Sequence, residues 1–164
     1  MKPAPTPYQA IVAAPGFALG IACDEHAVHQ IEFLEAQPEQ APANALAAEA
    51  ARQIKAYLAD PTRHFQLPLS PAGTPFQQRV WAEIARIPLG HVHTYGQLAT
   101  RLHNAPRAVG QACGANPYPL VVPCHRVVAA GGLGGFNQHS AGFLLDVKRW
   151  LLAHEGMPLA HPPC

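Results

Sequence analysis

Residues 120–128 constrain this chain more than any other segment, because a cysteine, a histidine and an arginine stand consecutively between two β-branched apolar runs. A buried strand has little use for three polar side chains in a row, so the segment predicts a thiol held in a sheltered, shaped place. Pro123 removes a backbone donor and restricts Val122 to extended geometry. We therefore expect a strand that ends or bends at Cys124 and delivers its sulfur to the wall of a cavity.

Length and hydropathy indicate a globular protein. The 164 residues suffice for one compact domain or two small lobes. No apolar run approaches the roughly 20 residues that cross a bilayer, and the first residues lack the apolar stretch of a signal peptide. We therefore expect a soluble protein with no membrane partner, cytoplasmic in location, or nuclear if its source is eukaryotic.

The cysteines and histidines form no recognisable metal site. The four cysteines are too few and too scattered for a disulfide framework. The ten histidines include no HExxH motif and no compact Cys/His cluster. Cys23 with His26 or His29 supplies two ligands at most, and nothing nearby completes a set of four. We expect no metal.

The two halves of the chain differ in charge. Residues 1–75 hold four Lys or Arg and seven Asp or Glu, whereas residues 76–164 hold seven Lys or Arg and three Asp or Glu. The net charge of the whole chain is only +1. The second half is therefore the better candidate for contact with an anionic partner.

Three short strand-like runs open the chain, at residues 8–13, 18–23 and 28–34. Strands spaced this closely favour an antiparallel meander. Residues 44–59 then have the apolar periodicity of a helix. A stretch rich in proline and glycine at residues 68–74 marks a boundary. We assign residues 1–70 to an N-terminal α/β lobe and residues 74–158 to a second domain.

The second domain is predicted to be mostly helical. Thr74 caps one helix, and Thr94 begins the capping-box pattern of a shorter one. Asn104 starts a further helix over residues 106–115, and two short helices joined by a tight turn suggest a helix-turn-helix. A last helix spans residues 143–154 and is expected to bury Leu144, Val147, Trp150 and Leu151. The fold class is α+β, an antiparallel-sheet lobe followed by a mostly helical lobe.

The predicted helix at residues 106–115 has one face that is nearly bare of side chains. Its apolar face carries Val109, Ala112 and Cys113, and the rest of its surface carries Arg107, Ala108, Gly110, Gln111 and Gly114. One interpretation is close packing against another helix. The other is close approach to nucleic acid, because a helix edged by glycine and alanine suits a minor groove only about 6 Å wide. Long polar side chains are scarce on this face, so we expect little sequence specificity.

These pieces resemble the methylated-DNA–protein-cysteine methyltransferase family, whose members remove alkyl groups from oxygen 6 of guanine. The resemblance rests on PCHR at residues 123–126, RAVG at 107–110, ANP at 115–117, TYGQLA at 94–99 and WLLAHEG at 150–156. These motifs cover residues 75–156 in the family's order and spacing. Residues 1–70 match only in outline, as the family's small lobe of ribonuclease H-like fold, and the second lobe would be of winged helix-turn-helix type.

The resemblance implies the chemistry of the site. Cys124 is the alkyl acceptor, His125 acts through a bridging water, and Glu155 polarises that histidine. Tyr95 assists the guanine leaving group. The thioether product has no route back to a thiol, so each protein reacts once, without a cofactor. It would be a DNA repair enzyme that works as its own co-substrate.

The resemblance also implies how the protein meets its partner, which is double-stranded DNA containing alkylated guanine, bound by a monomer. Arg107 takes the place of the extruded nucleotide, and Thr94, Ala108, Gly110, Gln111 and Gly114 complete the DNA-contacting set. Asn116 ties the helix to the reactive loop, and the backbone near Val127 contacts the base. Phe136 and Asn137 would wall the base pocket, although the family often has a tyrosine where this chain has Phe136.

Elementary chemistry supports these roles and leaves alternatives. A free thiol is only a few per cent ionised at neutral pH, so Cys124 needs a base, and a His–Glu pair can supply it. Neighbouring strand residues point to opposite faces, which favours a water between Cys124 and His125. The alternative is a strand histidine bonded to backbone. A carboxylate at a helix C-terminus is disfavoured by the helix dipole, and we expect His125 to be the cation that compensates Glu155. The alternative is an exposed carboxylate before a glycine cap.

Other positions have simpler interpretations as well. Asn116 precedes a proline and could be a turn residue, and Tyr95 could be an aromatic side chain packed between helices. Two other functions also remain open. One is a damage-binding protein of the alkyltransferase-like kind, which usually has tryptophan in place of the cysteine. The other is a helix-turn-helix regulator whose thiol is a sensor.

Overall fold

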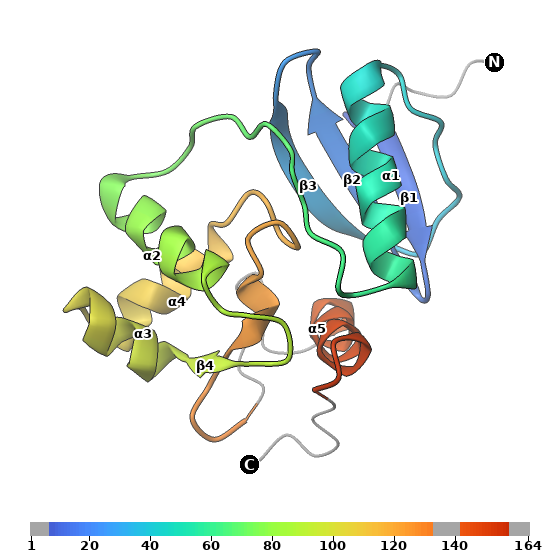
Figure 1. The fold of residues 1–164 in the computed structure, drawn as a ribbon. Coiled ribbons are helices and arrows are strands. Elements are labelled where there is room, and N and C mark those ends of the chain that lie inside the picture. Colours follow the sequence, from blue (N-terminus) through green and yellow to red (C-terminus); the bar gives the residue numbers. More distant parts are fainter. Residues whose placement is uncertain (1–6, 133–141, 158–164) are drawn as a thin grey trace. The chain divides into compact units, whose positions relative to one another are not determined.

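The chain divides into two compact units, Met1–Pro71 and Ala72–Cys164. The computed structural model, shown in Figure 1, describes residues 7–132 and 142–157. Within them, no helix is both long and apolar enough to cross a membrane. The same residues contain no group of three or more His, Cys, Asp or Glu side chains arranged to hold a metal ion.

The first unit is an antiparallel sheet covered by one helix. Its strands are β1 (Ala10–Ala14), β2 (Phe17–Cys23) and β3 (Val28–Glu35), hydrogen-bonded in the order β1-β2-β3. Helix α1 (Ala45–Ala59) lies across one face of the sheet (Figure 1). It begins where the Asn44 side chain accepts a hydrogen bond from Ala47 N at 2.8 Å. The predicted meander and helix are therefore confirmed, with ends displaced by one or two residues.

The second unit is built from helices and two very short strands. The helices are α2 (Pro75–Ala85), α3 (Tyr95–Leu102), α4 (Pro106–Gly114) and α5 (Phe143–His154). Strands β4 (His93–Thr94) and β5 (Val127–Val128) pair in parallel, and a 3-10 turn, η1 (Cys124–Arg126), precedes β5. The α+β class predicted from the sequence is confirmed.

Local sequence signals set the helix starts in this unit. The hydroxyls of Thr74 and Thr94 each accept a hydrogen bond from the N3 backbone. The side chains of Gln77 and Gln97 accept one from the N-cap backbone, so both capping boxes are present. Helix α4 has no such side-chain cap. Its N-cap is Ala105, not Asn104, because the Asn104 side chain bonds the adjacent Ala105 N at 2.8 Å instead.

Three helices form the support for the site. Helices α2, α3 and α4 contact one another, and Ile84, Leu98 and Val109 are fully buried among them. The indole N–H of Trp81 donates to Ala112 O at 2.8 Å, which fixes α4 against α2. The predicted apolar face of α4 is confirmed, because Val109, Ala112 and Cys113 are its buried residues.

Two sequence predictions for this unit are wrong. Residues 120–122 are not a strand: Leu120 has a left-handed φ of 75°, Val122 N bonds Tyr118 O, and the only strand residues here are Val127 and Val128. The buried face of α5 is also shifted, and consists of Leu145, Val147, Lys148, Leu151 and Leu152. Leu144 and Trp150 are only half-buried. The helix has adjacent apolar residues near each end, so the sequence did not decide which of them are buried. A lysine on the buried face also made that face look polar.

Candidate functional site

Cys124 begins the 3-10 turn η1 rather than ending a strand. Its backbone N bonds Val122 O at 2.8 Å across Pro123, and Arg126 N bonds Pro123 O at 2.9 Å, which closes the turn. The cysteine is only 3% exposed. This burial raises the pKa of the Cys124 thiol, while a hydrogen bond from Asn116 and the positive charge of Lys148 lower it. The thiol is thus sheltered, and two groups beside it favour its ionised form.

Asn116 joins the end of α4 to the segment that carries Cys124. Its Nδ2 donates to Val122 O at 3.0 Å, and its Oδ1 accepts from Tyr118 N at 2.9 Å. Asn116 is buried, so these bonds are shielded from water. The bond to Tyr118 N, two residues on, is that of an Asx turn. The bond to Val122 O links the end of α4 to the backbone two residues before Cys124.

Three charged or titratable side chains meet behind the thiol. His125 Nε2 lies 2.8 Å from Glu155 Oε2. The Arg126 guanidinium donates through Nε to Glu155 Oε1 at 2.8 Å and through Nη2 to Oε2 at 3.1 Å. Its Nη1 donates to Ile87 O at 2.7 Å. Glu155, the residue that follows α5, therefore accepts three N–H groups from the turn η1.

The protonation state of this cluster follows from its burial. Burial lowers the pKa of His125, and the charges of Arg126 and Lys148 lower it further, against the raising effect of Glu155. A neutral His125 that donates Nε2–H to Glu155 carries its lone pair on Nδ1, and that atom is buried without a hydrogen-bond partner among the described residues. His125 is thus neutral at neutral pH, with an Nδ1 lone pair that can accept a proton. The expected role of cation for Glu155 belongs to Arg126 instead.

The sequence patterns missed Lys148, which is fully buried. Its Nζ donates to Val127 O at 2.8 Å and lies 5.9 Å from the centre of the Tyr95 ring. Burial lowers its pKa to about 8, and the thiols of Cys124 and Cys113 act in the opposite direction. The available signal was its position three residues from both Leu145 and Leu151, which places it on the apolar stripe of α5.

The side chains of Tyr95 and Cys113 both have raised pKa values. Burial raises the pKa of Tyr95 above its ordinary value, with contributions from Cys113 and Cys124. Burial likewise raises the pKa of Cys113 to about 12. The Tyr95 hydroxyl therefore keeps its proton at neutral pH and remains able to donate it in a hydrogen bond.

The residues predicted to contact DNA lie apart from the thiol cluster. Arg107, Gln111 and the half-buried Ala108, Gly110 and Gly114 occupy the outer side of α4. A Cβ placed on Gly110 would meet no atom within 4 Å, so packing within this protein does not require glycine there. Arg107 makes no ion pair or hydrogen bond with the residues that the structure describes. The outer face of α4 is therefore open.

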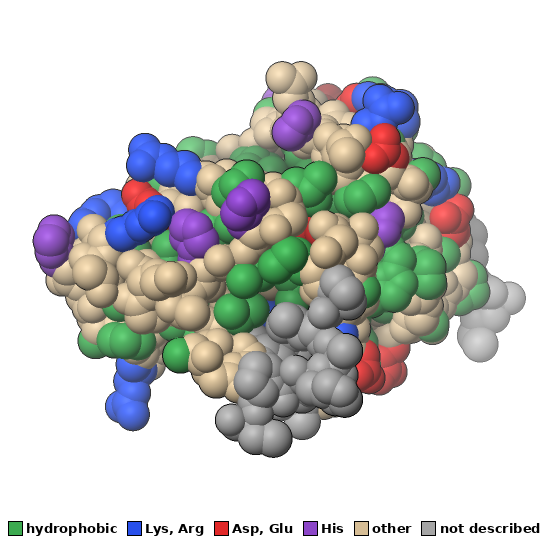
Figure 2. All heavy atoms as spheres, turned by 60° about the horizontal axis from the view of Figure 1, so that its bottom comes forward, with side chains coloured by type: hydrophobic (Ala, Val, Ile, Leu, Met, Phe, Trp, Pro, Cys, Tyr) green, Lys and Arg blue, Asp and Glu red, His purple; other side chains and the backbone are tan. Residues whose placement is uncertain are grey.

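The remaining predicted residues are distributed as follows. The Thr94 hydroxyl accepts a hydrogen bond from Gln97 N at 3.0 Å, so it serves the cap of α3. The Val127 side chain is fully buried, and its carbonyl accepts from Lys148. Phe136 and Asn137 lie outside the described residues. Figure 2 shows Lys, Arg and His side chains over the helical unit with few Asp or Glu side chains among them.

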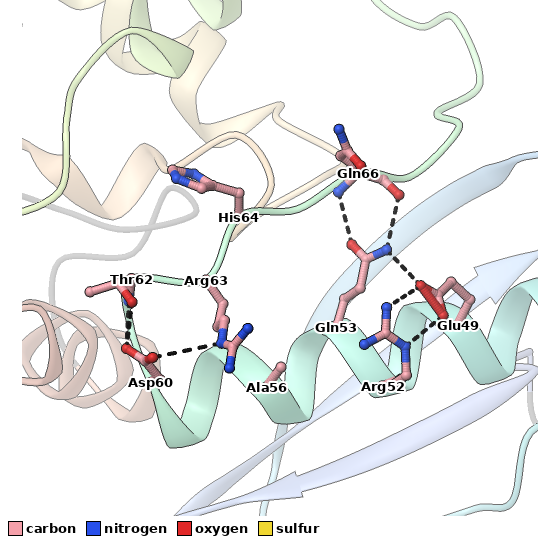
Figure 3. A pocket seen from close by; sticks show the side chains of 9 residues that line it. All are labelled: Glu49, Arg52, Gln53, Ala56, Asp60, Thr62, Arg63, His64 and Gln66. Carbon is pink, nitrogen blue, oxygen red and sulfur yellow. Dashed lines mark hydrogen bonds and ion pairs between the residues drawn. The ribbon is translucent and has the colours of Figure 1, made fainter.

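The first unit has a polar groove of its own, with a volume of about 520 Å³, beside α1 (Figure 3). Gln53 bonds both Glu49 and the backbone of Gln66, and Glu49 also pairs with Arg52. Asp60 pairs with Arg63 in the same way. Because these side chains satisfy one another, the groove indicates no ligand.

Comparison with known proteins identifies the class. Residues 75–157 match the family described as 6-O-methylguanine DNA methyltransferase, DNA binding domain. The methylated-DNA–protein-cysteine methyltransferase of Methanosarcina acetivorans is 38% identical over 157 residues, which cover 91% of this chain and 98% of that protein. The constitutive enzyme of Bacillus subtilis is 44% identical over 108 residues, 62% of this chain and 66% of the relative.

Solved structures agree with these matches. The Mycobacterium tuberculosis O6-methylguanine methyltransferase superposes with a TM-score of 0.75 at 33% identity, covering 92% of this chain and 94% of that one. The M. tuberculosis OGT in complex with DNA has a TM-score of 0.72 at 32% identity, with 90% and 92% covered. This chain belongs to the methylated-DNA–protein-cysteine methyltransferase family.

Proposed function

We propose that this protein repairs DNA by transferring the alkyl group from oxygen 6 of an alkylated guanine to Cys124. The bond between Sγ and the alkyl carbon forms as the bond from that carbon to oxygen 6 breaks. The thiol proton passes through a bridging water to Nδ1 of His125. The Tyr95 hydroxyl donates a hydrogen bond to ring nitrogen 3 of the departing guanine, where it offsets the developing negative charge. The sulfur keeps the alkyl group, so each molecule reacts once without a cofactor.

One observation carries this proposal: a buried thiol is followed directly by a neutral histidine whose Nε2 is held by Glu155 and whose Nδ1 has no partner among the described residues. Since burial raises the pKa of Cys124, the thiolate is disfavoured at neutral pH. A base with an available nitrogen, on the residue next to Cys124, supplies the proton acceptor that the thiol needs.

The burial of Cys124 also bears on how the substrate arrives. A base stacked inside a duplex does not reach a thiol that is 3% exposed, so the nucleotide must be turned out of the helix. We propose that α4 enters the minor groove of duplex DNA and that Arg107 fills the space left by the extruded nucleotide. In this proposal residues 74–158 form the DNA-binding and alkyl-acceptor domain, residues 1–70 form the N-terminal lobe, and the protein acts as a cytoplasmic or nuclear monomer.

The test is a mass measurement. The protein is mixed with a duplex containing O6-methylguanine, and the intact mass is recorded. We expect a gain of one methyl group per protein on Cys124, none in Cys124→Ala, and a normal gain in the matched control Cys113→Ala, which removes the other thiol near the site. DNA binding without a mass change would instead indicate a damage-binding protein. No preference for the lesion would indicate a regulator.

The open face of α4 gives a second expectation. Gly110→Leu removes an interior helical glycine and should stabilise the protein by up to about 1 kcal/mol, because a Cβ at this position meets no atom within 4 Å. The same side chain should obstruct the DNA and slow repair of duplex substrate at least about tenfold, with little effect on reaction with the free modified base. Ala82→Leu, on the exposed side of α2, is the control for added bulk. Equal rates on duplex DNA would remove α4 from the interface.

A further inference from the structure

Arg126 is the least exposed arginine side chain that takes part in an ion pair within the described residues. Each of its three nitrogens donates a hydrogen bond. The side chain is 14% exposed and its partner Glu155 is 1% exposed. Two parallel N–H groups meet the two carboxylate oxygens, and the third donor holds Ile87 O just beyond α2. Such a fork fixes both the position and the plane of the carboxylate, which a single point charge does not do.

Arg126 offsets the cost of placing the Glu155 charge where it lies. Glu155 lies at the C-terminal end of α5, where the exposed carbonyls of the helix disfavour a negative charge. Removal from water adds a further cost to a buried carboxylate. Arg126 is permanently protonated, so the pair is neutral as a whole and the carboxylate stays an acceptor. His125 can then donate Nε2–H to it without becoming a cation itself.

The charges that act on His125 come from its own turn and from α5. Arg126 and Lys148 lower the pKa of His125, and Glu155 raises it. An ionised Cys124 would lie beside it on the same turn. Helix α2 also packs on η1, but its Glu83 and Arg86 pair with each other at the surface. Of these groups, Arg126 alone touches the oxygen that His125 also contacts.

We propose that Arg126 is a positioning residue for alkyl transfer: it balances the charge of the Glu155 carboxylate and holds it in one orientation, so that His125 stays neutral and keeps the lone pair on Nδ1. The inference rests on the proposed function. The proton of Cys124 moves to Nδ1, and Arg126 touches neither the thiol nor the alkylated base. Without it, Glu155 would present its full negative charge to His125 and draw a proton onto the ring.

The direction of the pH effect follows. Neutral His125 is the active form, so the transfer rate falls as pH drops through the pKa of His125, and this decrease is the acid limb of the pH profile. Removing the charge of Arg126 raises that pKa. In Arg126→Met the acid limb should therefore move up by about one pH unit, and the rate on that limb should fall by up to about tenfold relative to the parent protein at the same pH. Arg126→Lys, which keeps the charge and loses the fork, should leave the limb near its original place while the rate falls about tenfold.

The experiment combines two readouts on the full chain. The His125 ring is titrated by NMR in DNA-free protein, and single-turnover methyl transfer is measured against pH. Arg149→Met is the matched control, because Arg149 forms an exposed pair with Asp146 and should change neither readout.

An unshifted acid limb and ring titration in folded Arg126→Met would overturn the inference. If that variant does not fold, Arg126→Lys decides: transfer at the original rate would show that the fork is not needed. Absence of transfer by the unaltered protein at every pH would contradict the proposed function, whereas the ring titration would still test Arg126.

Discussion

Glu155→Gln is expected to cause the largest combined loss of stability and activity in this protein. The carboxylate accepts three N–H groups from His125 and Arg126, whereas an amide has one acceptor oxygen and adds two donors. Arg126 would keep its charge in a nearly buried place without a counterion. Breaking a buried pair in this way costs about 3–5 kcal/mol, which is a large part of the stability of a small protein. Chemical denaturation measures this loss directly.

The same substitution should slow methyl transfer by roughly 10²–10⁴-fold. If the amide N–H groups face His125, they donate to Nε2, and the ring proton moves to Nδ1. The nitrogen that should take the thiol proton is then already protonated. Transfer is measured in single-turnover experiments under conditions where the variant remains folded.

Glu83→Gln is the matched control for the glutamate substitution. Glu83 also pairs with two arginines, Arg86 and Arg101, but those side chains are mostly exposed. Surface pairs of this kind contribute about 0–1 kcal/mol, so this variant should differ little from the parent protein. If Glu155→Gln were as mild as Glu83→Gln, the buried cluster would not be the support of the site.

The parts of the fold that follow from local rules were predicted well. The N-cap at Thr74 and the capping box at Thr94 depend on residues at most three apart, and the sheet of the first unit depends on short strand-like runs between turns. The segment before Cys124 was not predicted, because its β-branched residues favour a strand. Contacts from Asn116 and the left-handed backbone at Leu120 bend it instead. These contacts join residues that no local pattern relates.

The candidate site was predicted unevenly for the same reason. Cys124 and His125 were singled out by their own neighbours, since polar residues within an apolar run need an explanation. Glu155 is thirty positions from His125 along the chain, and only the family resemblance connected them. Arg126 stood in the motif without a role, and Lys148 received no prediction. Charged residues are rarely fully buried, so its position on an apolar stripe was only a weak signal. The roles of Arg126 and Lys148 depend on their burial and on their hydrogen-bond partners, which the sequence does not give.

Substitution of Lys148 by glutamine is expected to have the second large effect: the protein should become more stable, and methyl transfer should become slower. Burial lowers the pKa of Lys148 to about 8, so at neutral pH the folded protein holds a protonated amine at a cost of about 3 kcal/mol relative to the unfolded chain. Lys148→Gln removes this cost and keeps a donor for Val127 O. We expect the variant to be more stable than the parent below about pH 8. The difference should shrink as pH rises to about 10.5, where the lysine of the unfolded chain is also neutral.

Methyl transfer should be slower in the same variant. The charge of Lys148 lowers the pKa of Cys124, and a neutral amide leaves less of the thiol ionised. We expect the rate of transfer to fall about tenfold. Lys148→Met is the companion variant: it leaves Val127 O without its donor and should be about 1–3 kcal/mol less stable than Lys148→Gln, with a similar loss of rate. Chemical denaturation at two pH values and single-turnover transfer measure both effects. A Lys148→Gln protein that loses rate only because it loses stability would show that Lys148 supports the fold and not the thiolate. In that case Asn116 and His125 would be left as the groups that ionise Cys124.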